Sequence, residues 1–200
     1  MSDVSTRRGH GVVLATRNAH KLGEMAEMVP DVEWLALDDT YGDPPETGTT
    51  FEANALQKAR YGYTVTGLPC LADDSGIEVD ALGGRPGVYS KRYSPEGTDT
   101  ANNTLLLQEL SLHLNRRARY RCVLALVGPG YEQVVHGTCE GVIGTDPRGN
   151  GGFGYDPLFW PDRAVGRTMA ELTRAEKAAI SHRGAAMRAM TPILRRLVGV

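Results

Sequence analysis

Two acidic residues stand side by side in the segment Asp73-Asp74-Ser75-Gly76, directly after a short apolar run. Adjacent carboxylates at the end of a buried strand need a partner, because an unpaired buried charge is costly. Mg²⁺ is a natural partner, since it combines carboxylate ligands with water and substrate phosphates. Neighbouring strand residues point to opposite faces, so we expect one of the two carboxylates in a given pocket. The alternative is a turn, because Asp, Ser and Gly all favour turns.

A second candidate metal ligand, Glu46, lies in a loop of residues 38–50 that is dense in Asp, Pro, Gly and Thr. The helix that follows carries Asn54 and Lys58 four residues apart, which places them on one face. They border an apolar stripe of the same helix. These two side chains therefore belong either to the rim of a pocket or to an exposed polar margin.

The segment of residues 15–21, ATRNAHK, stands where a predicted strand gives way to a helix. Backbone amides at a helix N-terminus favour anions, and Lys21 adds a full positive charge in the first turn. This pattern favours phosphate binding, although it is not the GxxxxGK[ST] phosphate loop. The alternative is a solvated loop that carries a surface lysine.

A glycine-rich stretch, GNGGFGYDP at residues 149–157, contains two aromatic residues, Phe153 and Tyr155. An aromatic ring between glycines suits stacking against a flat ligand, because glycine lets the backbone approach closely. Long loops in compact domains are more often functional or disordered than inert, and the aromatics argue against disorder. The alternative is a structural loop whose aromatic side chains pack into the core.

The C-terminal segment of residues 170–184 ends in Ser-His-Arg-Gly. Lys177 and Arg183 could contact a phosphate and the edge of a base, or they could be plain charges on a helix surface. Ser75, Ser181 and His182 could imitate a serine hydrolase, but the GxSxG elbow of that class is absent from the chain.

The predicted elements alternate between strands and helices. Strands are expected at residues 11–16, 32–37, 70–72, 77–79, 119–127 and 131–143, and helices at 22–29, from 51, at 99–114 and from 174. Thr49 with Glu52 and Thr173 with Glu176 form capping boxes, residues 144–167 are irregular, and Pro192 kinks or interrupts the last helix. Gly128-Pro129-Gly130 predicts a hairpin. This pattern indicates a three-layer α/β/α fold with a mixed central sheet.

Length, charge and cysteine content exclude several classes of protein. A chain of 200 residues fits one domain, here residues 11–200 after a short disordered lead at residues 1–10. The net charge of −2 argues against a nucleic-acid-coating surface. No apolar run approaches a membrane span, and the three cysteines show no CxxC spacing that would indicate zinc or a disulfide framework. A reduced, cytoplasmic setting is expected.

Five blocks in order along residues 11 to 190 make the chain resemble the inosine triphosphate pyrophosphatase family, also called XTP/dITP diphosphatases. The blocks are LATRNAHKLGEM, ETGTTFEANALQKAR, LADDSGIEVDALGGRPGVYSKRYS, GGFGYDPLF and AELTRAEKAAISHRG. Any one block could arise by chance, but five in order with compatible spacing are highly specific.

The resemblance implies two lobes around a nucleotide cleft, Mg²⁺ dependence, a homodimer, and hydrolysis of ITP, dITP and XTP to the monophosphate and pyrophosphate. Asp74 would be the general base and a Mg²⁺ ligand, and Glu46 a second ligand. The first phosphate loop would comprise Thr16, Arg17, Asn18, Ala19, His20 and Lys21. The other substrate-binding candidates are Asn54, Lys58, Ser75, Phe153, Gly154, Tyr155, Asp156, Lys177, His182 and Arg183.

The first loop departs from the family pattern, because Arg17 and His20 stand where small residues are usual. Rival functions are a pyrophosphatase for modified pyrimidines, whose motifs do not match, a nucleotide sensor without turnover, and a structural dimer. A sensor need not keep Asp74, Glu46 and Lys21 together. A structural dimer leaves the charged loops unexplained.

Overall fold

The structure is a computed structural model that describes residues 11–16 and 19–199, with backbone only for residues 19–22 and Asp39. The predicted lead at residues 1–10 lies outside the described residues. The strands are β1 (Gly11–Leu14), β2 (Glu33–Ala36), β3 (Cys70–Val79), β4 (Arg117–Gly128), β5 (Tyr131–Ile143) and β6 (Phe159–Pro161). The α-helices are α1 (Ala19–Met28), α2 (Phe51–Thr66), α3 (Asp99–Glu109), α4 (Arg174–Ile180) and α5 (His182–Val198).

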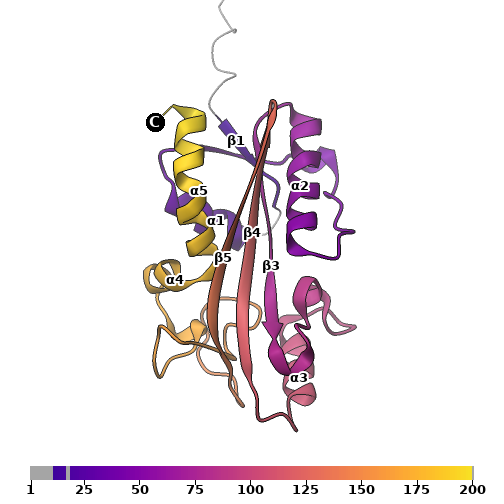
Figure 1. The fold of residues 1–200 in the computed structure, drawn as a ribbon, viewed down its shortest axis with the longest axis vertical. Helices are drawn as coiled ribbons and strands as arrows, with labels where there is room; N and C mark the ends of the chain where they lie inside the picture. Colours follow the sequence, from indigo (N-terminus) through magenta and orange to yellow (C-terminus); the bar gives the residue numbers. More distant parts are fainter. Residues whose placement is uncertain (1–10, 17–18, 200) are drawn as a thin grey trace, which may run out of the picture. The chain divides into compact units, whose positions relative to one another are not determined.

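The strands form one six-stranded sheet in the order β2-β1-β3-β4-β5-β6. β1 pairs in parallel with both β2 and β3, whereas β5 and β6 are antiparallel. The two longest strands, β4 and β5, lie beside each other (Figure 1) and are connected by the turn at Pro129-Gly130. These pairings confirm the predicted α/β class and mixed sheet. The nucleotide cleft stays a prediction.

The chain divides into two compact units, each assembled from separate stretches of sequence. The first unit contains the residues up to Asp74, Val123–His136 and the residues from Ala186 onward. The second contains Ser75–Cys122 and Gly137–Ala185. The boundary therefore falls inside β3, between two predicted site residues, and the single domain of residues 11–200 stays a prediction.

Each unit has a buried apolar interior. In the first unit, Val12, Val13 and Leu14 of β1 are almost fully buried, as are Ala55 and Ala59 of α2. In the second, side chains of β3, α3 and β4–β6 pack with the glycine-rich loop into one cluster. Its largest members are Ile77, Leu82, Leu106, Leu110, Tyr120, Ile143, Tyr155, Leu158, Phe159 and Met169. Burial of apolar surface at about 25 cal/mol per Å² is the main stabilising contribution.

The segment around Asp73 and Asp74 is not a turn between two strand pieces. β3 runs without interruption from Cys70 to Val79, and both carboxylates lie within it, 2% and 8% exposed. The turn-forming tendency of Asp, Ser and Gly is overridden because this strand lies inside the sheet, where its backbone groups pair with neighbours.

Several element boundaries differ from the prediction. The N-cap of α2 is Thr50, whose side chain accepts a hydrogen bond from Ala53 N, so the box at Thr49 was wrong. The helical C-terminal segment breaks at Ser181, and Pro192 lies inside α5. α3 ends at Glu109, and the region expected to be irregular contains β6. The capping box at Thr173 and Glu176 is confirmed.

Within the described part of the chain, no helix combines the length and apolar character that crossing a bilayer requires.

Candidate active site

Five polar residues of the first unit form what we call the carboxylate–lysine cluster: Glu46, Asn54, Lys58, Asp73 and Asp74. Asn54 Nδ2 donates to Asp74 Oδ2 at 3.0 Å. Lys58 Nζ lies 2.6 Å from Glu46 Oε1 and 3.5 Å from Asp74 Oδ1. The two helix residues are buried and meet β3, so the exposed-margin alternative is wrong for both.

Local structure explains why these side chains meet. Asn54 and Lys58 are one helical turn apart on α2. One turn further on, a Cβ at Gly62 would lie 2.3 Å from Cys70 Sγ, so glycine is what lets α2 approach β3 this closely. Two side chains of α2 fix the loop that precedes this helix. Asn54 Oδ1 accepts from Gly48 N at 2.8 Å, and Gln57 Oε1 accepts from Thr47 N at 3.0 Å, which holds the adjacent Glu46 in place.

The charge of Lys58 is maintained by its acidic neighbours. Burial by itself lowers the pKa of the Lys58 ammonium, but the charges of Asp73 and Asp74 raise it, and the resulting pKa lies above its ordinary value of 10.5. The hydrogen bond to Glu46 acts in the same direction. Lys58 is therefore a permanent cation at neutral pH.

The donor set of this cluster fits Mg²⁺. Among residues 11–16 and 19–199, no three His, Cys, Asp or Glu side chains are placed to hold a metal by themselves. Mg²⁺ does not require such a cage, because it is bound by one or two carboxylates together with waters and substrate phosphates. Glu46 and Asp74, which share one ammonium partner, supply carboxylate oxygens of that kind.

The predicted phosphate loop is described only in part. Thr16 follows β1 and is partly buried. Arg17 and Asn18 lie outside the described residues, as do the side chains of Ala19, His20 and Lys21. The backbone of residues 19–21 forms the first turn of α1, so the predicted change from strand to helix is confirmed.

In the second unit, Tyr120, Phe153, Asp156, Lys177, His182 and Arg183 form what we call the aromatic–basic cluster. The ammonium of Lys177 lies 4.7 Å from the centroid of the Phe153 ring, and the guanidinium carbon of Arg183 lies 5.7 Å from it. Both basic residues are buried. The alternative that they are plain surface charges is therefore wrong.

Asp156 connects three other members of this cluster by hydrogen bonds. Its Oδ2 accepts hydrogen bonds from Lys177 Nζ at 2.9 Å and from Phe153 N at 3.0 Å, and its Oδ1 accepts from the Tyr120 hydroxyl at 3.1 Å. The carboxylate is 3% exposed. It therefore fixes the loop that carries Phe153 and the position of Lys177.

The end of α4 and the start of α5 determine where Lys177, His182 and Arg183 lie. The capping box of Thr173 and Glu176 starts α4, and Lys177 lies in its last turn. At the break, Ser181 Oγ accepts from Gly184 N at 3.1 Å, which starts α5 at His182. Arg183 then follows in the first turn of α5, and its Nη2 donates to Ser75 Oγ at 3.2 Å.

The aromatic residues of the glycine-rich loop lie in different surroundings. Tyr155 is buried in the core of the second unit, where its hydroxyl donates to Ser90 O at 2.9 Å. Phe153 is only partly buried and has the two cations against its ring. Gly154 has a φ of 64°, a left-handed conformation that glycine adopts easily.

A model of the Ham1 family matches residues 12–193 of the sequence. The chain belongs to the Ham1 family. The resemblance inferred from the sequence is thereby confirmed, because the curated relatives carry the matching name. A dITP/XTP pyrophosphatase of Nocardia farcinica is 52% identical over 197 residues, covering 93% of this chain and 95% of the relative. One of Thermus thermophilus is 50% identical over 190 residues, covering 92% and 91%.

Solved Ham1-family structures share the fold. The Staphylococcus aureus Ham1 protein matches with a TM-score of 0.85 and 36% identity, covering 93% of this chain and 98% of that one. The structure of a nucleoside-triphosphatase / dITP/XTP pyrophosphatase from Mycobacterium abscessus matches with a TM-score of 0.75 and 48% identity, covering 91% and 99%.

Tyr120 is the member of the aromatic–basic cluster in this Ham1-family chain that sequence reasoning missed. Its ring stacks on His182 with centroids 4.6 Å apart and planes 11° from parallel. Burial and the neighbouring charge of Asp156 raise the pKa of the Tyr120 hydroxyl well above its usual value, so it remains a donor. The signal was present in the alternation of arginines with buried residues along β4, because a buried tyrosine usually has a hydroxyl partner.

Replacing Tyr120 with Phe tests the importance of that hydroxyl. The stack on His182 stays, but Asp156 loses one of three donors. We expect the free energy of unfolding to fall by about 1.5 kcal/mol, the lower end for a bond to a charged group, because two donors remain. Urea unfolding measures this. Tyr89→Phe, at a ring that is 54% exposed, is the control and should leave stability unchanged. An equal effect of both variants would contradict the role of Tyr120.

Gly152→Ala should disrupt the Asp156 contacts. A Cβ at Gly152 would lie 2.0 Å from Asp156 Oδ2, and the φ of 74° is unfavourable for alanine. Displacing the carboxylate would break its bonds to Phe153 N and Lys177, so we expect a raised KM for the nucleotide. Gly166→Ala is the matched control, because its φ is 80° but nothing lies near its added Cβ. Both variants lose about 1–2 kcal/mol of stability to the backbone. Equal KM values would refute the contact.

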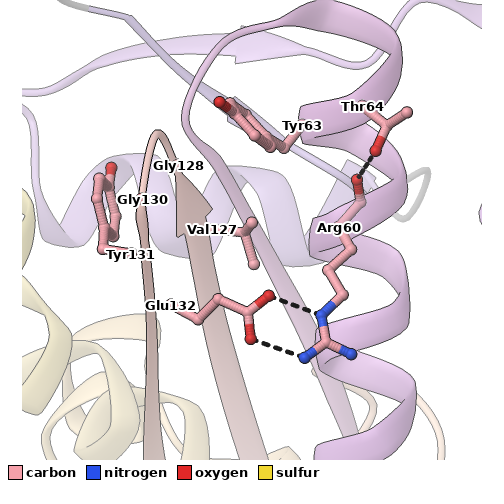
Figure 2. Close-up of a pocket in the computed structure, with 8 residues that line it drawn as sticks. All are labelled: Arg60, Tyr63, Thr64, Val127, Gly128, Gly130, Tyr131 and Glu132. Atoms are coloured by element: carbon pink, nitrogen blue, oxygen red, sulfur yellow. Dashed lines mark hydrogen bonds and ion pairs between the residues drawn. The ribbon is translucent and has the colours of Figure 1, made fainter.

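A separate pocket of about 470 Å³ lies between α2 and the tip of the β4–β5 hairpin in the first unit (Figure 2). Two hydrogen bonds of 2.7 Å connect Arg60 and Glu132 along its wall, so these opposite charges neutralise each other. None of the predicted site residues lines this pocket.

Proposed function

We propose that this Ham1-family chain hydrolyses the deaminated purine nucleotides ITP, dITP and XTP to the monophosphate and pyrophosphate. The observation that carries the proposal is the ring of Phe153 with two buried cations, Lys177 and Arg183, against it. The names of the curated relatives, dITP/XTP pyrophosphatase, support the same activity.

The aromatic–basic cluster suits a deaminated purine base. A flat base stacks on an aromatic face such as that of Phe153, which is only partly buried. Inosine and xanthosine carry an oxygen at the six-position, which accepts hydrogen bonds from Lys177 or Arg183. Adenine carries an amino group there, which is itself a donor and cannot accept a hydrogen bond from Lys177 or Arg183. Sites built to bond one polar group reject its analogue by up to about 10⁴–10⁵-fold.

The triphosphate, with about four negative charges near neutral pH, requires cations. Lys21 and the amides of Thr16 to Lys21 are assigned to the phosphates, because helix N-termini bind anions. Lys58 contributes a further charge next to Asp74. Asn54 donates a hydrogen bond to the other oxygen of the Asp74 carboxylate and so holds it in place.

Hydrolysis requires a base for the attacking water, and Asp74 has this role. Hydrogen bonds are donated to both of its oxygens by Asn54 and Lys58, which matches the carboxylate form. Asp74 takes a proton while the water oxygen bonds to the α-phosphorus, and the bond to the bridging oxygen breaks so that pyrophosphate departs. Mg²⁺, held by Asp74 and Glu46, would polarise phosphoryl oxygens and neutralise leaving-group charge.

The activity implies a cellular role and setting. Removing deaminated triphosphates keeps them out of DNA and RNA, so the enzyme cleanses the nucleotide pool. Residues 11–200 are proposed to act as one enzymatic domain, because a single family model matches residues 12–193. A cytoplasmic homodimer is proposed, with a small polyanion as its substrate. No nucleic-acid partner is proposed, because a net charge of −2 does not favour a nucleic-acid-binding surface.

A substrate panel tests the proposal. The protein is incubated with Mg²⁺ and ITP, XTP, dITP, GTP, ATP or dUTP, and released pyrophosphate is measured. Release from the first three alone supports the proposed function. Binding without release would identify a nucleotide sensor, and release from dUTP would indicate a pyrimidine enzyme.

A further inference from the structure

One residue of the glycine-rich loop, Gly154, is held at both of its backbone polar groups by a single helix. Gly154 N donates to Asp99 Oδ2 at 2.7 Å, and Asn103 Nδ2 donates to Gly154 O at 3.0 Å. Asp99 and Asn103 are four residues apart on α3, so their side chains share one face. We call this pair of contacts the α3 clamp.

The helix that carries the clamp is itself well anchored. Thr98 caps its N-terminus by accepting from Ala101 N, and Asp99 in the first turn complements the helix dipole. Asn102 fastens α3 to the preceding segment, since its Oδ1 accepts from Ser94 N at 2.7 Å and its Nδ2 donates to Lys91 O at 3.2 Å. The α3 clamp therefore has a fixed base.

The position of the clamp matters because Gly154 lies between two aromatic residues with different surroundings. Tyr155 on one side is buried in the core, and Phe153 on the other side presents its ring to Lys177 and Arg183. Gly154 has a φ of 64°, and glycine has more backbone freedom than any other residue. Fixing its N–H and C=O removes that freedom next to Phe153.

We propose that Asp99 and Asn103 are positioning residues that fix Gly154 and so orient Phe153 for a purine base. The α3 clamp acts on recognition of the base and not on binding of the phosphates. This inference rests on the proposed function, in which the loop of Phe153 binds the base.

The test separates the two parts of the nucleotide. Binding of IMP and of inorganic pyrophosphate is measured by calorimetry for the unaltered protein, Asp99→Ala and Asn103→Asp. Losing one hydrogen bond to a charged group, as in Asp99→Ala, typically weakens an interaction by about tenfold or more, and Asn103→Asp sets a carboxylate oxygen against the Gly154 carbonyl oxygen. We expect IMP to bind about tenfold more weakly to both variants and pyrophosphate to bind within about twofold of normal. Asp99→Asn should recover most of the IMP affinity, because an amide oxygen still accepts from Gly154 N.

Two controls come from the same region. Lys91→Gln removes the exposed lysine 3.5 Å from the other Asp99 oxygen, and Thr104→Ala changes an exposed residue of α3. Both should bind IMP normally. Hydrogen exchange of the Gly154 amide reports on the clamp without any ligand, and it should accelerate in Asp99→Ala but not in Lys91→Gln.

The outcomes are distinguishable. If the unaltered protein binds IMP but the variants bind it equally well, or lose IMP and pyrophosphate affinity together, the inference is wrong. Unchanged exchange at Gly154 in Asp99→Ala would also overturn it, even if that variant were partly unstable. If the unaltered protein neither binds IMP nor releases pyrophosphate from ITP, the proposed function itself has failed.

Discussion

Asp74→Asn is expected to remove nearly all turnover while nucleotide binding survives. The amide cannot take a proton from water, and loss of a general base typically costs about 10²–10⁴-fold in rate. Loss of the proposed carboxylate ligand for Mg²⁺ would add to this effect. Steady-state release of pyrophosphate from ITP gives kcat, and calorimetry with ITP gives binding.

The isosteric amide also creates a local mismatch, which the experiment must separate from catalysis. Asp74 accepts a hydrogen bond from Asn54 at one oxygen and from Lys58 at the other. In the variant, an NH₂ group replaces one of these oxygens, so a donor would lie against a donor. Thermal unfolding of the variant therefore accompanies the kinetics. Glu78→Gln, in the same strand, is the control and should retain normal turnover. Near-normal kcat in a folded Asp74→Asn would eliminate Asp74 as the base.

Lys58→Met is expected to destabilise the first unit strongly. The substitution leaves the buried carboxylates Asp73 and Asp74 without their shared cation. Removing one partner of a buried ion pair costs about 3–5 kcal/mol. We expect about 3 kcal/mol, because the side chain of Glu46, the third acid, is 39% exposed and partly screened by water. Urea unfolding at pH 7.5 measures the change.

The pH dependence of this difference has a definite sign. The pKa of Lys58 is raised in the folded protein above its ordinary value of 10.5. Its stabilising contribution is therefore complete below about pH 10.5 and disappears as the pH rises through the higher folded pKa. The gap in unfolding free energy between the unaltered protein and Lys58→Met should stay constant from about pH 6 to 9 and shrink above about pH 10.5.

A matched control and a metal titration sharpen the test. Arg60→Met, two residues along α2, removes an exposed ion pair with Glu132 and should cost at most about 1 kcal/mol. Added Mg²⁺ should raise the melting temperature of Lys58→Met more than that of the unaltered protein, since the metal can replace the lost cation. Equal losses in Lys58→Met and Arg60→Met would show that the carboxylate–lysine cluster is not a coupled buried group.

The sequence predicted the elements that local patterns specify. Strand β1 and the capping box of Thr173 follow from an apolar run and cap chemistry that involve neighbouring residues only. The segment at Asp73 and Asp74 was harder, because its local preference for a turn is overridden by pairing within the sheet. Short β6 was missed for a related reason, since three residues in a glycine-rich region carry too little periodicity.

The candidate site was predictable where a residue type is unusual for its place. Adjacent carboxylates, an aromatic ring among glycines and a lysine on an apolar helix border each indicated chemistry before the fold was known. Asp99 and Asn103 gave no such signal, because Asp or Asn on a helix is ordinary, and the only signal for Tyr120 was its place among the alternating arginines of β4. Their contacts join residues 36 to 55 positions apart, which one sequence does not reveal.

The discontinuous build of the two units has a consequence for synthesis at the ribosome. The first unit includes residues from Ala186 onward, and the second needs residues up to Ala185. Neither can complete its interior until almost the whole chain has emerged, although β1 and α2 are made early. Such non-local closure slows folding and leaves apolar segments exposed meanwhile. Nascent chains halted before α5 should therefore remain sensitive to protease along β1 and α2.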